Sequence, residues 1–164
     1  MALGVSGNIT GTFNAQDVRN VGLNAGANIP INNTSATNFI TGTGALGVQV
    51  LFQQTRTFSG TTDTLDLFSG LSDSYGTPVV LTAVKAIQVV NTGTSLITLG
   101  DAGSNPWNTF LGATSTLILP PGAWLMAATP DATGWVVGTS TNVNFLVTGT
   151  SGQTYTIALL GTGT

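Results

Sequence analysis

Asp63 and Asp66 are the one close pair of carboxylates in the chain. Carboxylate oxygens are the ligands that hard divalent cations prefer. The two residues fall within a predicted strand, however, and side chains three positions apart on a strand point to opposite faces of the sheet. We therefore expect two separate aspartates at a solvated strand edge, and no metal site.

Lys85 and Asp101 are two further titratable residues whose surroundings invite a functional interpretation. Lys85 lies inside an apolar segment, and a buried lysine can act as a nucleophile. We expect it instead to face outward from its strand or to pair with a carboxylate. Asp101 lies in the turn-rich segment 100–106, where an aspartate side chain bonds to nearby backbone, so we expect a structural role.

The chain has few other residues of the types that catalyse reactions. The chain has no His, no Cys and no Glu, and acid–base and nucleophilic catalysis draw heavily on these residues. Segment 42–47 (GTGALG) fits the pattern G-x-G-x-x-G, but it precedes a predicted strand, whereas a dinucleotide site needs it to follow one and open a helix. A serine triad would lack its histidine. We predict that the protein is not an enzyme and binds no cofactor or metal.

Charge is scarce. Charged residues make up 5% of the chain, the net charge is −3, and hydrophobic residues make up 41%. Soluble domains usually carry about 25% charged residues. Because a weakly charged surface gives little protection against association, we expect partner chains to cover much of it. The chain has no basic patch for nucleic acid, and no apolar run approaches the roughly 20 residues of a membrane span, so neither partner is expected.

Residues 1–45 differ in composition from the rest of the chain. They are rich in Gly, Asn, Thr, Ala and Ser, with isolated apolar residues and no sustained helical spacing. Such a segment cannot hold a core alone, yet it has more β-branched and aromatic residues than a flexible linker. We interpret it as an extended arm that becomes ordered against another surface. The alternative is a flexible tail.

From residue 46 onward, short apolar runs alternate with turn residues. Strands are predicted at 48–58, 63–68, 79–91, 95–99, 116–119, 123–128, 135–137, 143–147 and 154–160. Turn signals lie between them, among them Asn91-Thr92-Gly93, Pro120-Pro121-Gly122 and the segment 129–134. Intervals of roughly 8–12 residues between turns are typical of a β-sandwich or barrel. One short helical turn is expected at Leu67, Phe68 and Leu71.

Five aromatic residues are candidates for recognition or for the core. Trp124 and Trp135 lie in predicted strands, so we expect them in the core, and Phe145 is a further strand candidate. Trp107 and Phe110 lie in a loop rich in Gly, Ser, Asn and Pro. Each of these two is either an anchor folded under the loop or an exposed interface residue.

The second half of the chain carries a recurring set of strand and turn patterns. Its segments are 84–92 (VKAIQVVNT), 99–100 (LG), 105–112 (NPWNTFLG), 119–123 (LPPGA), 130–135 (PDATGW) and 155–161 (YTIALLG). This set resembles small virion proteins of tailed phages, the capsid cement or decoration proteins. The resemblance covers roughly residues 55–164 and includes no catalytic signature.

The extended N-terminal arm at residues 1–45 lies outside the matched region, and its role is our own inference. For the body at residues 46–164, the resemblance implies an all-β fold, a jelly-roll-like β-sandwich. It further implies a homotrimer in the virion, on the outer surface of the capsid. There it would bind the major capsid protein and clamp neighbouring capsomers. The arm would lie across capsomers or a neighbouring subunit, and symmetry would turn weak contacts into high avidity. The predicted interface residues are Phe13, Arg19, Ile29, Ile31, Phe39, Arg56, Trp107 and Phe110.

Two other functions stay open at this point. In the first, the chain is a tail or head fibre module that binds a host surface glycan, with Trp107 and Phe110 stacking on sugars. In the second, it is itself a coat or tube subunit that forms long polymers.

Overall fold

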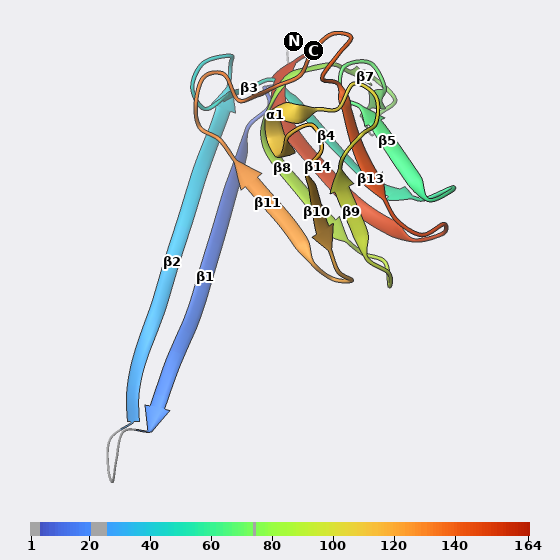
Figure 1. Ribbon diagram of the computed structural model, residues 1–164. Helices are drawn as coiled ribbons and strands as arrows, with labels where there is room; N and C mark the ends of the chain where they lie inside the picture. The colour runs from blue at the N-terminus through green and yellow to red at the C-terminus, as the bar shows by residue number, and fades with distance from the viewer. Residues whose placement is uncertain (1–3, 21–25, 74) are drawn as a thin grey trace.

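Two antiparallel sheets packed face to face form the body of the protein (Figure 1). The computed structural model describes residues 4–20, 26–73 and 75–164, without the side chains of residues 17–20 and 26–29. The first sheet has the order β11 (Trp124–Ala128), β8 (Leu81–Asn91), β14 (Thr154–Gly163), β4 (Val50–Thr57), and β12 (Trp135–Val136) also pairs with β8. The second sheet has the order β10 (Thr116–Leu119), β9 (Ile97–Gly100), β13 (Asn144–Thr148), β5 (Thr62–Asp66).

The core lies between these sheets, because alternate side chains of each strand point inward. The first sheet contributes Phe52, Ile87, Val89, Ile157 and Leu159, and the second contributes Leu65, Ile97, Leu99, Phe145 and Val147. The predicted all-β sandwich is confirmed. Each predicted strand has a counterpart in the structure within a few residues.

Strands that are neighbours in the sheets are mostly distant in the sequence. Numbered 1 to 8 along the chain as β4, β5, β8, β9, β10, β11, β13 and β14, the strands stand in the order 6-3-8-1 in the first sheet and 5-4-7-2 in the second. The last strand, β14, therefore pairs with both β4 and β8 in the middle of the first sheet.

The N-terminal segment forms a long hairpin, called the arm below, that projects from the body (Figure 1, blue). Its strands β1 (Gly7–Asn20) and β2 (Gly26–Thr41) pair antiparallel from Gly7↔Phe39 to Asn20↔Gly26. The short strand β3 (Gly47–Val48) runs parallel to the end of β2 and joins the arm to the body. We expected an arm that becomes ordered only against another surface. In the structure, the two strands of the arm form backbone hydrogen bonds with each other.

The remaining elements are short. They are β6 (Leu71–Ser72), β7 (Pro78–Val79) and the helix α1 (Asn108–Leu111). The helical turn expected at Leu67, Phe68 and Leu71 is present as a single turn: the Gly70 N–H donates to the Asp66 carbonyl four residues back over 2.9 Å, and Leu71 then begins β6. No helix in the described ranges is long and apolar enough to cross a membrane.

Candidate interaction surface

The carboxylate of Asp63 is already occupied by two neighbouring side chains. Arg56 Nε and Nη2 donate to Asp63 Oδ2 and Oδ1 over 2.5 and 2.8 Å, and Tyr155 Oη donates to Oδ2 over 2.8 Å. Burial raises the pKa of Asp63, but the hydrogen bonds from Arg56 and Tyr155 and the Arg56 charge outweigh it and hold the pKa below its ordinary value. The trio ties β5 of one sheet to β4 and β14 of the other. Arg56, a predicted interface residue, thus serves inside the body.

An Asp63→Asn substitution should lower the free energy of unfolding by roughly 2 kcal/mol at pH 7, because Arg56 loses its counter-ion. The folded-state pKa of Asp63 is depressed, so its contribution is present above the unfolded carboxyl pKa of about 4 and is lost as the pH falls through the lower folded value. Urea unfolding should therefore show the gap between wild type and variant closing toward pH 2. Tyr155→Phe, which removes one hydrogen bond, is the milder control. A gap that stays constant with pH contradicts this prediction.

Asp66 holds a turn through its carboxylate, and Asp101 lies in an exposed loop. Asp66 Oδ1 accepts from the Phe68 and Ser69 backbone N–H groups over 2.9 and 3.0 Å, and its Oδ2 accepts from Ser69 Oγ over 2.6 Å. Asp101 is exposed and adopts a φ of 56°, as an aspartate in a tight turn can. Within the described residues, no group of three or more acidic, histidine or cysteine side chains lies close enough to hold a metal ion.

Lys85 is fully buried, so the expectation that it faces outward is wrong. Its Nζ donates to the main-chain carbonyl of Asp131, in the turn that precedes β12. The Asp131 carboxylate binds the turn itself, accepting from the Thr133 and Gly134 N–H groups over 2.7 Å each. The ammonium group therefore holds the turn against β8, and its place beneath the turn leaves it closed to a substrate.

Trp107 and Phe110 turn inward around α1. Trp107 is 3% exposed, and its Nε1 donates to the Val136 carbonyl over 3.0 Å. Its ring stacks on Phe110 at 5.4 Å between centroids and meets the edge of Phe145 at 5.8 Å. Phe110 packs edge-on against Trp135 at 4.9 Å. Trp107 is thus an anchor under the loop. The prediction that it is an interface residue is wrong, because its ring has no free face.

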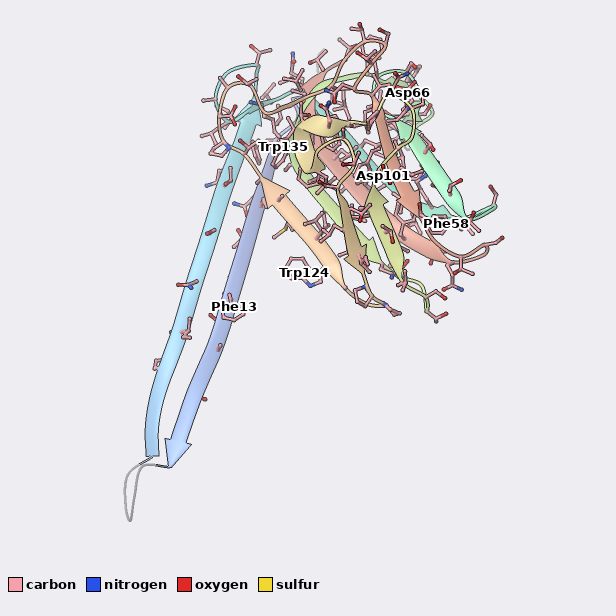
Figure 2. The ribbon with its side chains drawn as sticks, in the orientation of Figure 1. Phe13, Phe58, Asp66, Asp101, Trp124 and Trp135 are labelled. Atoms are coloured by element: carbon pink, nitrogen blue, oxygen red, sulfur yellow. The ribbon has the colours of Figure 1, made fainter. Side chains whose placement is uncertain are left out.

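Trp124 was expected in the core, and it is 59% exposed instead. It begins β11, where Leu125 and Ala127 face the core and their neighbours face outward. Figure 2 shows Trp124 extending from β11 on the side of the arm. Trp135, the other strand tryptophan, is partly buried and packs against the core as expected. The alternation along β11 thus leaves a large aromatic ring on the outside of the first sheet.

The arm has two chemically different faces, because side chains alternate along each of its strands. One face, called the arm face below, carries Gly7, Ile9, Gly11, Phe13, Ala15, Ile31, Asn33, Ser35, Thr37 and Phe39. The opposite face carries Asn8, Thr10, Thr12, Asn14, Gln16, Pro30, Asn32, Thr34, Ala36 and Asn38. The alternation was missed in the sequence because Gly and Ala fill several positions of the apolar face.

The predicted interface residues of the arm divide into two groups. Phe13 and Ile31 are 63% and 42% exposed, and both lie on the arm face. Phe39 is only 2% exposed and packs with Val48, Ala86 and Leu160, so it fixes the base of the arm to its own body, and its prediction as an interface residue is wrong. Arg19 and Ile29 lie in β1 and β2, and their side chains fall outside the described part of the structure.

The outer side of the first sheet is the second large uncharged surface. Cross-strand neighbours form three rows on it, together called the outer sheet face: Trp124, Val90, Thr156 and Thr55; Met126, Gln88, Ala158 and Gln53; Ala128, Ala86, Leu160 and Leu51. None of these residues carries a charge. The arm face and the outer sheet face are therefore the candidate interaction surface of the protein.

Comparisons with known proteins give no relative for this chain: no family model, no curated protein and no solved structure matches it.

Proposed function

We propose that this chain is a structural protein of a phage virion, a capsid cement or decoration protein. It binds the major capsid protein on the outer face of the head as a homotrimer and stabilises the contacts between capsomers. The observation that carries the proposal is the pairing of a charge-poor sandwich with a long, two-faced arm, in whose strands Asp17 and Arg19 are the only charged residues. A free monomer gains nothing from such an arm, whereas a protein that works in a repeated assembly gains a contact with each copy.

Three further observations support this proposal. The strand orders 6-3-8-1 and 5-4-7-2 support a jelly-roll arrangement of the sandwich, the fold that the resemblance to cement proteins implies. The aspartates 63, 66 and 131 and the single lysine, Lys85, are engaged in holding the body together. The glycan-binding alternative is weakened, since Trp107 is buried and Phe110 is partly buried, with its ring stacked on that of Trp107.

A binding experiment with phage heads tests the proposal. Purified chain is mixed with expanded heads that lack it, the heads are sedimented, and bound copies are counted against the major capsid protein. We expect saturation at a fixed ratio set by the capsid lattice, and heads that withstand higher temperature or lower salt once saturated. Tails and unexpanded heads serve as controls. Absence of saturable binding to the head, or binding only to the tail, contradicts the proposal.

A further inference from the structure

The arm face extends beyond the body that it packs against. Near its base it lies close to the outer sheet face: a Cβ at Gly7 would stand 3.0 Å from Leu160 Cδ2, and one at Gly11 would stand 3.6 Å from Met126 Cε. Glycine at position 7 lets β1 approach the sheet closely, and at position 11 a Cβ would be in ordinary van der Waals contact. Further out, Phe13 and Ile31 have no such cover and stay exposed. The arm face thus extends beyond the part of the outer sheet face against which it packs.

The outer sheet face likewise has an uncharged area that the arm of the same chain does not cover. In its third row, the base of the arm covers Ala86 and Leu160, whereas Leu51 of that row and Trp124 of the first row are exposed. Between base and sheet lies an open groove of about 470 Å³, lined on one side by residues 6–10 and on the other by residues of β4, β8, β11 and β14. Figure 2 shows Trp124 and the arm residue Phe13 where the arm and β11 diverge. The exposed residues of the arm face and of the outer sheet face therefore lie near the place where the arm separates from the body.

We propose that the arm of a second copy of this chain packs with its apolar face on the outer sheet face, in the groove and over Trp124. This inference rests on the proposed function for its biological setting. It adds to that function the surface through which copies of the chain bind each other.

Charge favours a second copy over a foreign partner. Residues 5–16 and 30–41 of the arm contain no charged side chain, and neither does the outer sheet face. The arm carries one pair of opposite charges, Asp17 and Arg19, toward the far end of β1. Recognition between different proteins usually uses complementary charge. Here two uncharged surfaces of the same chain match each other in composition, and the first contact between them already exists at the base of the arm. An arm from a second copy would extend that existing contact.

The size of the contact is sufficient for a stable assembly. The part of the arm beyond Gly11 spans about 30 Å at 3.3 Å per residue and is about 10 Å wide, so its face measures roughly 300 Å². Each arm buries that area on itself and on the sheet it covers. A dimer with two reciprocal contacts buries roughly 1,200 Å² in its one interface, the lower end of the range of specific interfaces. A closed ring of three buries roughly 600 Å² at each of its three interfaces and gains stability from closure.

Cysteine crosslinking tests the contact directly, because the natural chain has no cysteine. A chain with Phe13→Cys is mixed with a chain with Trp124→Cys, so that a disulfide between the two positions can form only between copies. We expect a covalent heterodimer on a non-reducing gel after mild oxidation. The matched control replaces Phe13→Cys by Thr12→Cys, which lies on the opposite face of the arm and should crosslink at least tenfold less. Equal crosslinking from both positions, or none from either, overturns the inference.

The mass of the protein in solution, measured by light scattering at micromolar concentration without any phage particle, gives the second readout. The wild type should be an oligomer, and the double variant Phe13→Asn, Ile31→Thr should dissociate at concentrations at least 100-fold higher. The control variant Thr12→Asn, Thr34→Asn on the polar face should keep the wild-type mass. A monomeric wild type, or a double variant that stays associated, overturns the inference. Failure of head binding with this assembly intact would overturn only the proposed function.

Discussion

A Trp107→Ala variant is expected to lose about 4 kcal/mol of folding free energy, and its melting temperature should fall by roughly 10 °C. The ring is 3% exposed and fills the space between Phe110 and Phe145. Its removal leaves a cavity and takes away the indole hydrogen bond to the Val136 carbonyl, which still accepts from Thr109 Oγ1 and Asn142 Nδ2. Urea and thermal unfolding followed by circular dichroism measure the loss.

Trp124→Ala is the matched control for this experiment, because it removes the same side chain from an exposed site. We expect its free energy of unfolding to stay within about 0.5 kcal/mol of wild type. Its effect should appear only in association between copies. A stable Trp107→Ala variant that fails to adsorb to cells would revive the glycan-binding alternative and contradict the placement of Trp107 in the core.

Shortening the arm is expected to weaken head binding at least 100-fold. In the short-arm variant, residues 11–35 are replaced by Asn-Gly, which joins Thr10 to its cross-strand neighbour Ala36 by a favoured two-residue hairpin turn. Ile9 and Phe39 stay, so the base of the arm keeps its contacts with Ala86 and Leu160. The variant should fold like the wild type and behave as a monomer. It loses the avidity that several linked bodies provide.

Sedimentation with heads over a range of protein concentrations measures this change. A full-length chain with Thr34→Asn, altered only on the polar face of the arm, should bind as the wild type does. Unchanged occupancy by the short-arm variant would show that the arm has no part in assembly or binding, and it would contradict the role assigned to the arm.

The body was predictable from sequence because its strands are short and alternate between apolar and polar residues. They are also bounded by residues that favour turns for known physical reasons. In the segment 129–134, for example, Asp131 caps the turn and Gly134 adopts a φ of 70°. The same local rules placed Trp124 in a strand but assigned it to the core, whereas it lies on the outer side of an edge strand and is exposed. Edge position depends on pairing with distant residues, which local patterns do not contain.

The candidate surface was only partly predictable for a related physical reason. Phe13 and Ile31 were chosen as apolar residues in a polar segment, and the structure places both on one face. The alternation that places Phe13 and Ile31 on one face also includes Gly7, Gly11 and Ala15. These small residues are weakly hydrophobic, so the alternating pattern is hard to recognise in the sequence. The engagement of Asp63 by Arg56 and Tyr155 joins residues up to 92 positions apart, which spacing alone does not reveal.

A reconstruction of intact virions at a resolution that separates strands is the most direct test of the central claim, that this chain acts as a many-copy protein on the outside of a head. The account predicts density for the sandwich on the outer face of the capsid at every equivalent lattice position, with the hairpin of one copy lying across the outer sheet face of its neighbour. Density for the chain confined to a tail or fibre, or isolated single copies whose hairpins touch no other copy, would contradict it.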